Sequence, residues 1–119
     1  KRDRYAIGEK TQTELVGRPV AGRTYDFAPV IGVFLKEHLF GDIFERDILN
    51  RQERELATVG ALAGIGNVNA QLTSHMRVSM NTGISAEQLQ ETVRLLDKKA
   101  GPATGSNAQR VLGSLLLQK

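Results

Sequence analysis

Length, composition and charge exclude several classes of protein at once. The chain has 119 residues, enough for one domain with a modest core, and its 40% apolar and 24% charged residues are typical of a globular chain rather than a disordered one. It contains no cysteine, which excludes a disulfide scaffold, a thiolate-bound metal and thiol redox chemistry by this chain alone. The net charge of +3 is too small and too dispersed to indicate binding to nucleic acid.

The sequence gives no indication of a membrane segment. Its longest apolar stretch, residues 27–44, is interrupted by Lys36, Glu37, His38 and Asp42, whereas a helix that crosses a bilayer needs about 18–20 apolar residues. We therefore expect no membrane partner and a cytoplasmic location. The first residue is a lysine rather than a methionine, so the sequence leaves open an upstream signal peptide.

The first 24 residues predict an arm in front of the folded domain. Residues 1–24 are polar and contain glycine and arginine, and we expect one short helix in them, around residues 11–16. The helical domain itself is predicted over residues 25–119. Its first helix follows Pro29, which suits the first turn of a helix, and continues through residues 30–44.

Four further helices are predicted, separated by glycine and proline. They are expected at residues 51–64, 69–82, 86–99 and 107–117. Ser85 and Gln88 have the spacing of a capping box ahead of the third of them, and the Gly101-Pro102 pair ends it. No segment alternates apolar and polar residues with the period of two that indicates a strand. The sequence therefore predicts an all-α fold with five to six helices.

The helix over residues 30–44 has more apolar surface than a small monomer can cover. Apolar side chains surround it on nearly every side, which is typical of a helix buried on all faces. Five helices cannot enclose it completely, and an exposed apolar remainder of that size indicates a subunit interface. We therefore expect a homo-oligomer.

Two consecutive helices each place one ionisable side chain toward their apolar side. At 100° per residue, Glu55 lies within the apolar stripe that includes Val59, whereas Glu53 lies on the solvated side. On the next helix, His75 lies about 60° from Leu72, at the edge of that helix's apolar stripe. Because the two helices are expected to pack antiparallel, Glu55 and His75 should meet between them.

This pair has two interpretations. A carboxylate in a core must be paired or neutral, because burying it bare costs several kcal/mol; Glu55 and His75 can therefore be a structural pair that fixes the register of the helices. The same pair can transfer a proton near neutral pH, as a general acid or base does. Periodicity alone favours the structural interpretation, since structural pairs are also common.

Three short motifs surround the pair. They are residues 52–59 (QERELATV), 71–75 (QLTSH) and 81–83 (NTG). In order and spacing they resemble the carboxymuconolactone decarboxylase family, and residues 34–44 (FLKEHLFGDIF) are similar to the helix that introduces the domain in one branch of it. The resemblance covers roughly residues 25–96. It implies a fold of the alkylhydroperoxidase D type, assembled into a homo-trimer or a homo-hexamer.

The resemblance implies one of two chemistries. In the alkylhydroperoxidase branch, a glutamate and a histidine that match Glu55 and His75 serve a Cys-x-x-Cys pair in a proton relay. Here the corresponding loop, residues 66–71, reads GNVNAQ. The chain therefore lacks the two thiols that the peroxiredoxin activity associated with the family requires. In the decarboxylase branch, carbon dioxide is lost from a carboxylated lactone in aromatic-ring degradation, with no cofactor.

A decarboxylase of that kind needs a proton donor and a cationic anchor for the substrate carboxylate. The candidate catalytic residues are Glu55 and His75, and the candidate substrate-binding residues are Arg51, Arg54 and Arg77. No metal is expected, because the two histidines of the chain lie on separate predicted helices.

Three functions follow from the residues and the resemblance. The first is a lyase that acts on a carboxylated lactone or a related ring-cleavage acid. The second is an oxidoreductase accessory that acts only with another protein, and the third is a non-catalytic oligomeric or small-molecule-binding protein. Residues 98–102 (KKAGP) depart from the Tyr-x-Gly-x-Pro element common among the decarboxylases, replacing an aromatic side chain with lysine. This departure keeps the third function open.

We predict that the purified protein reduces no organic peroxide at the expense of a dithiol, because it has no cysteine to oxidise. Consumption of cumene hydroperoxide with dithiothreitol and a metal chelator should equal that of a blank without protein. Turnover well above the blank would contradict the prediction.

Overall fold

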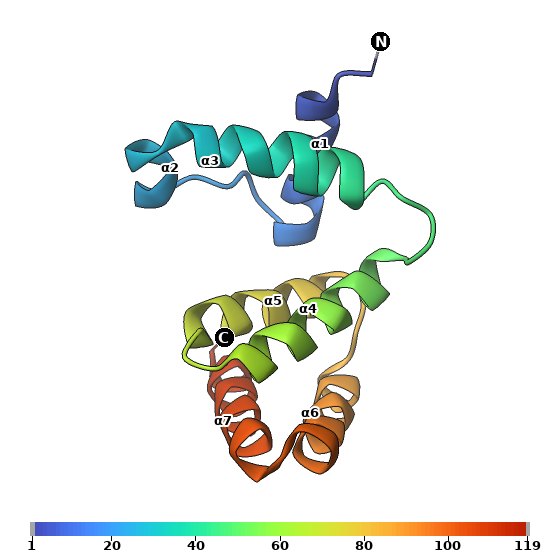
Figure 1. The fold of residues 1–119 in the computed structure, drawn as a ribbon, viewed down its shortest axis with the longest axis vertical. Coiled ribbons are helices and arrows are strands. Elements are labelled where there is room, and N and C mark those ends of the chain that lie inside the picture. Colours follow the sequence, from blue (N-terminus) through green and yellow to red (C-terminus); the bar gives the residue numbers. More distant parts are fainter. Residues whose placement is uncertain (1, 119) are drawn as a thin grey trace. The chain divides into compact units, whose positions relative to one another are not determined.

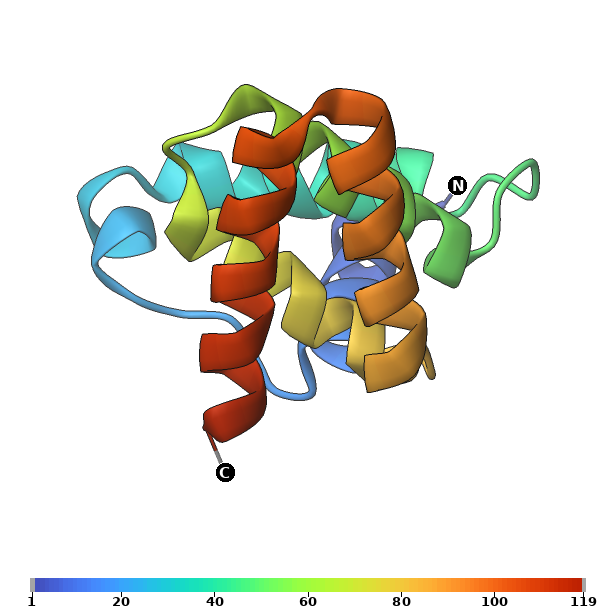
Figure 2. The same ribbon diagram turned by 90° about the horizontal axis from the view of Figure 1, so that it is seen from below.

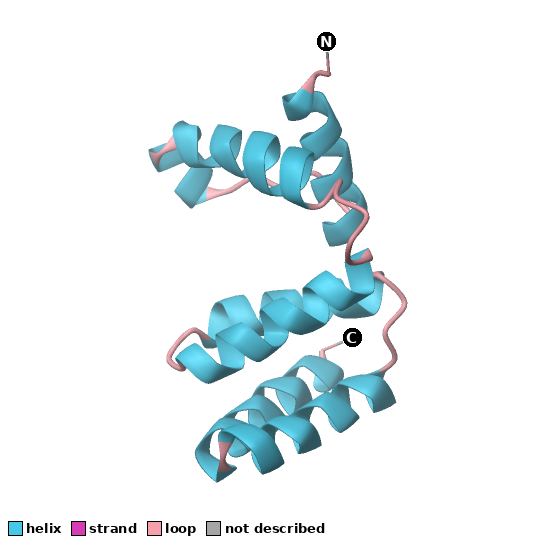
Figure 3. Cartoon of the chain, turned by 45° about the vertical axis from the view of Figure 1, so that its right-hand side comes forward, coloured by secondary structure: helices cyan, strands magenta, loops and turns pink. Residues whose placement is uncertain are grey.

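The computed structural model describes residues 2–118, and helices are the only regular secondary structure in them. Helices make up 79% of the structure, and no strand occurs in the described part of the chain (Figure 3). The all-α prediction is therefore confirmed. The chain divides into two compact units, an N-terminal unit that ends at Asn50 and a C-terminal unit that begins at Arg51. The division into an arm over residues 1–24 and a domain over residues 25–119 stays a prediction.

The N-terminal unit contains three α-helices and one π-helix. They are α1 (Arg4–Val16), α2 (Arg23–Phe27), α3 (Pro29–Phe34) and η1 (Leu35–Ile43) (Figure 1). Helix α1 begins where the Asp3 carboxylate accepts a hydrogen bond from the Ala6 amide at 3.0 Å, and it ends at Gly17 with φ of 82°. These two caps make it 13 residues long, so the prediction of a short helix around residues 11–16 is wrong in its extent.

Helix α3 continues directly into the π-helix η1. Its wider turn is visible in the hydrogen bond from the Phe44 amide to the Leu39 carbonyl, five residues back, at 2.9 Å. The predicted helix over residues 30–44 is therefore present, but from Leu35 onward it is a π-helix rather than an α-helix. Apolar periodicity gives no warning of this change, because the segment is apolar on nearly every side.

Two glycines allow α1 and η1 to cross with their backbones in contact. A Cβ atom at Gly8 would overlap the carbonyl group of Lys36, and one at Gly41 would overlap the carbonyl oxygen of Arg4. Polar pairs flank the crossing: Arg4 contacts Asp42 at 3.1 Å, and the Thr11 hydroxyl donates to a Glu45 carboxylate oxygen at 3.2 Å. Backbone contact and polar pairs, rather than a large apolar core, hold this unit together.

The C-terminal unit contains four helices. They are α4 (Arg51–Ile65), α5 (Asn69–Asn81), α6 (Ala86–Ala100) and α7 (Pro102–Leu117). The turn from α4 to α5 uses Gly66 and Asn67 at positive φ of 73° and 56°. The capping box of Ser85 and Gln88 is present at the start of α6. Helix α7 begins five residues before its predicted start, because Pro102 occupies the first turn directly after α6.

A continuous apolar core joins the four helices of this unit, in which α6 and α7 lie side by side (Figure 2). Its buried residues are Val59, Ala63, Leu72, Met76, Ile84, Leu89, Val93, Ala108, Val111, Leu112 and Leu115. No helix among residues 2–118 is both long enough and apolar enough to cross a membrane.

We predict that Gly8→Ala lowers the free energy of unfolding by about 1–3 kcal/mol, because the new methyl group must push α1 away from η1. Gly60→Ala is the matched control: a Cβ atom at this position in α4 has no heavy atom within 4 Å apart from the neighbouring backbone of its own helix. That change should be neutral or stabilising by up to about 1 kcal/mol. Urea unfolding followed by circular dichroism measures both, and equal stability of the two variants would contradict the close crossing.

Candidate functional site

Helices α4 and α5 lie side by side in the C-terminal unit and bring Glu55 and His75 together (Figure 1). The His75 Nδ1 atom lies 2.8 Å from the Glu55 Oε2 atom. The contact expected from helical periodicity is therefore confirmed. The catalytic role of the two residues stays a prediction.

The two partners differ sharply in exposure. The Glu55 side chain is 1% exposed, whereas the His75 side chain is 34% exposed. A buried carboxylate requires a hydrogen-bond donor or an opposite charge, and the imidazole supplies it. The other ring nitrogen, Nε2, has no hydrogen-bond partner among residues 2–118. His75 thus contacts the buried Glu55 side chain through Nδ1, while its second ring nitrogen, Nε2, is able to accept or donate a proton.

A chain of hydrogen bonds links the end of α5 to α4. The Gln52 side-chain amide donates to the Thr82 carbonyl at 2.8 Å, the Thr82 hydroxyl donates to the Ser79 carbonyl at 2.6 Å, and the buried Ser79 hydroxyl donates to the His75 carbonyl at 2.8 Å. Sequence reasoning missed Gln52. The sequence could have indicated Gln52, because it lies three residues before Glu55 and therefore almost on the same side of α4.

The three candidate arginines take different positions. Arg51 lies one turn before Glu55, on the same side of α4, and is half-buried, as is Arg54. Arg77 lies two residues after His75, about 200° around α5, and its guanidinium donates to the Gln118 side chain at 2.7 Å. Helix geometry thus directs Arg51, rather than Arg77, toward the side of the pair.

Three cavities within the units have linings that do not include Glu55 or His75. The largest, about 650 Å³, lies between α6 and α7 and is lined by Val93, Arg94, Asp97, Gly105, Ser106, Gln109 and Arg110. A second, of about 300 Å³, is lined by residues of α4, α7 and the turn before α5, and a third, of about 220 Å³, belongs to the N-terminal unit.

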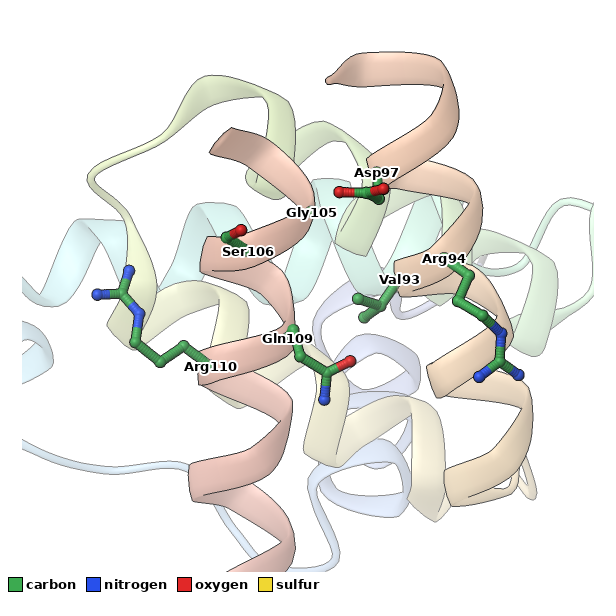
Figure 4. A pocket seen from close by; sticks show the side chains of 7 residues that line it. All are labelled: Val93, Arg94, Asp97, Gly105, Ser106, Gln109 and Arg110. Atoms are coloured by element: carbon green, nitrogen blue, oxygen red, sulfur yellow. The ribbon is translucent and has the colours of Figure 1, made fainter. Parts of the chain in front are cut away.

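The arginines of the cavity between α6 and α7 do not form a joint clamp for an anion. Figure 4 shows the Arg94 and Arg110 side chains directed away from each other. Arg94 is paired with Glu91, and Arg110 donates to the Asn107 side chain at 2.8 Å. Among residues 2–118, no three histidine, aspartate or glutamate side chains lie close enough together to hold a metal ion.

Comparison with known proteins finds a matching protein family and a similar curated protein. The model of the carboxymuconolactone decarboxylase family matches residues 31–108, which include Glu55, His75 and the whole of α4, α5 and α6. A 4-carboxymuconolactone decarboxylase of Acinetobacter baylyi is 28% identical to this chain over 108 residues, which cover 87% of this chain and 80% of that protein.

We predict that His75→Ala lowers the free energy of unfolding by about 3 kcal/mol, because it leaves the buried Glu55 carboxylate without its partner. Glu55→Gln should also destabilise, and the double variant should lose at least about 1 kcal/mol less than the sum of the two. His38→Ala, a change at the exposed second histidine, is the control and should stay within about 0.5 kcal/mol of wild type. Additive losses would show that the contact adds nothing to stability.

Proposed function

The chain belongs to the carboxymuconolactone decarboxylase family, and on that premise we propose that it is a cofactor-independent lyase that removes carbon dioxide from a carboxylated lactone or a related ring-cleavage acid. The observation that carries the proposal is the contact of 2.8 Å between His75 Nδ1 and the buried Glu55 carboxylate, with the imidazole one-third exposed. The printed name of the Acinetobacter baylyi relative supports the same reaction class.

The reaction needs a proton at the carbon that loses the carboxylate. The bond between that carbon and the carboxylate breaks, carbon dioxide leaves, and the electron pair stays on the substrate as a carbanion or enolate. His75 donates the proton from Nε2, since Nδ1 is held by Glu55. The Glu55 carboxylate fixes the orientation of the imidazole, and solvent then returns the proton to the exposed ring.

The substrate carboxylate requires a cationic anchor until the bond breaks. A guanidinium is well suited, because it binds a carboxylate through two parallel hydrogen bonds. Arg51 is the favoured anchor, since it lies one turn from Glu55 on the same side of α4. Arg54 follows at the adjacent position, and Arg77 is the weakest candidate because it lies about 200° around α5 from His75.

We predict that the protein releases carbon dioxide from 4-carboxymuconolactone and that His75→Asn lowers kcat at least about 100-fold. Asparagine retains a side-chain amide donor near the Nδ1 position, so Glu55 keeps a partner, but it cannot transfer a proton. His38→Asn is the matched control and should keep wild-type activity. Product formation is followed by mass spectrometry, and circular dichroism checks that each variant is folded.

Two results would contradict the proposal. One is a rate for the wild-type protein no higher than that of a blank, and the other is full activity in His75→Asn. The first result would support the second candidate function, a non-catalytic member of the family in which Glu55 and His75 are a structural pair. The 1% exposure of Glu55 is the observation that favours this candidate.

We also propose that the chain assembles into a homo-trimer or a homo-hexamer. Apolar side chains on α2 and α3 are exposed in the N-terminal unit: Phe27 is 92% exposed, Val30 71% and Phe34 61%. An apolar surface of this kind is typical of a subunit interface, and a second copy of the chain would cover it.

We predict that light scattering gives three or six times the mass of one chain at micromolar concentration. Phe34→Glu should lower that mass, because a charge would be buried in the interface. Leu117→Glu changes an 85% exposed residue at the end of α7 and serves as the control. The mass of a single chain for the wild-type protein would contradict the assembly.

A further inference from the structure

The N-terminal unit contains a small cavity with apolar and aromatic walls and one ammonium group. Its volume is about 220 Å³, and it is lined by Tyr5, Val20, Tyr25, Pro29, Gly32, Val33 and Lys36. All of these residues precede Arg51, so the cavity belongs to this unit alone. Neither Glu55 nor His75 contributes to it.

The ammonium group of Lys36 is held in a defined place. Its side chain is 16% exposed, and its Nζ atom lies 2.7 Å from a Glu9 carboxylate oxygen and 3.1 Å from the Tyr5 hydroxyl oxygen. The same atom lies 4.9 Å from the centre of the Tyr5 ring, a cation–π distance. The hydrogen bond to Glu9, followed by that to Tyr5, raises the pKa of Lys36 above its ordinary value. The group is therefore positively charged at neutral pH.

Two hydrogen-bond donors remain in this arrangement. An ammonium group has three N–H donors, and Glu9 and Tyr5 accept two of them. The Tyr5 hydroxyl accepts from Lys36 and retains its own proton, for which no acceptor occurs among residues 2–118. One N–H of Lys36 and the O–H of Tyr5 are thus available side by side, on two residues that line the same cavity.

We infer that this cavity is a second binding site, specific for a small cyclic monocarboxylate. The ligand carboxylate would accept hydrogen bonds from Lys36 and Tyr5, and its ring would contact the apolar walls that include Val20, Pro29 and Val33. A cavity of about 150 Å³ is known to hold benzene, so about 220 Å³ accommodates a six-membered ring and a carboxylate. A neutral ligand of the same shape accepts only weaker hydrogen bonds, because it lacks the negative charge that pairs with the Lys36 ammonium, and a cationic ligand is repelled by Lys36.

The sequence provides a selective reporter for this site. The chain has two tyrosines and no tryptophan, and both tyrosines, Tyr5 and Tyr25, line the cavity. Intrinsic fluorescence of the full chain therefore arises from the proposed site alone. Cyclohexanecarboxylate is a suitable probe because it does not absorb at the wavelength that excites tyrosine. Cyclohexanecarboxamide, which has the same ring without the charge, is the control ligand.

The inference predicts a saturable change in tyrosine emission with cyclohexanecarboxylate at millimolar concentration and a response at least about tenfold weaker with the carboxamide. Lys36→Met should weaken binding of the carboxylate by at least about tenfold. Lys10→Met, which changes an exposed lysine on α1, should leave it unchanged. Glu55→Gln should also leave it unchanged, because the site is independent of the proposed catalytic pair.

A second variant tests the cavity without changing its charge. A Cβ atom at Gly32 lies 3.1 Å from the Tyr25 ring, so Gly32→Val fills the space and should abolish binding. If circular dichroism shows that Lys36→Met is unfolded, Gly32→Val decides whether the carboxylate binds in this cavity. The inference is overturned if the wild-type protein gives no saturable response, if the carboxamide binds equally well, or if folded Gly32→Val binds as the wild type does.

Discussion

The C-terminal unit depends on one electrostatic constraint, the burial of the Glu55 carboxylate. An unpaired charge in an apolar core costs several kcal/mol, so α4 is held at the one register in which Glu55 meets His75 on α5. The turn at Gly66 and Asn67 reverses the chain over a short distance, and Gln52 binds the far end of α5. The apolar core packs around the same helices, and the hydrogen bond of 2.8 Å between His75 and Glu55 joins α5 to α4 within it.

The N-terminal unit has a different physical basis. Its helices α1 and η1 approach until their backbones touch, and this approach is possible because Gly8 and Gly41 have no side chains. Charged and polar residues, Lys36 with Glu9 and Arg4 with Asp42, then pair across the crossing. The apolar side chains of α2 and α3 are exposed in this unit. The N-terminal unit therefore has exposed apolar surface and a small cavity, whereas the C-terminal unit contains the contact between Glu55 and His75.

The proposed chemistry follows from the unequal exposure of the two members of that pair. A fully buried histidine would be cut off from substrate, and a fully exposed glutamate would be screened by water and unable to hold the imidazole in place. Here Glu55 is 1% and His75 34% exposed, so one partner provides orientation and the other provides access. The chain contains no cysteine, so this pair has no thiol beside it of the kind that peroxide reduction by thiols requires.

The sequence by itself determined the all-α class, the capping box at Ser85 and the meeting of Glu55 with His75, because helical periodicity and local caps depend only on neighbouring residues. Tertiary structure alone decided the close crossing of α1 with η1 and the donor arrangement around Lys36. Both depend on contacts between segments about 30 residues apart, at Gly8 and Gly41 in the crossing and between Tyr5 and Lys36 at the cavity, and no local pattern encodes such contacts. The candidate arginines fall between the two cases: helix geometry places Arg51 on the same side of α4 as Glu55, whereas the bond from Arg77 to Gln118 depends on how α5 packs against α7.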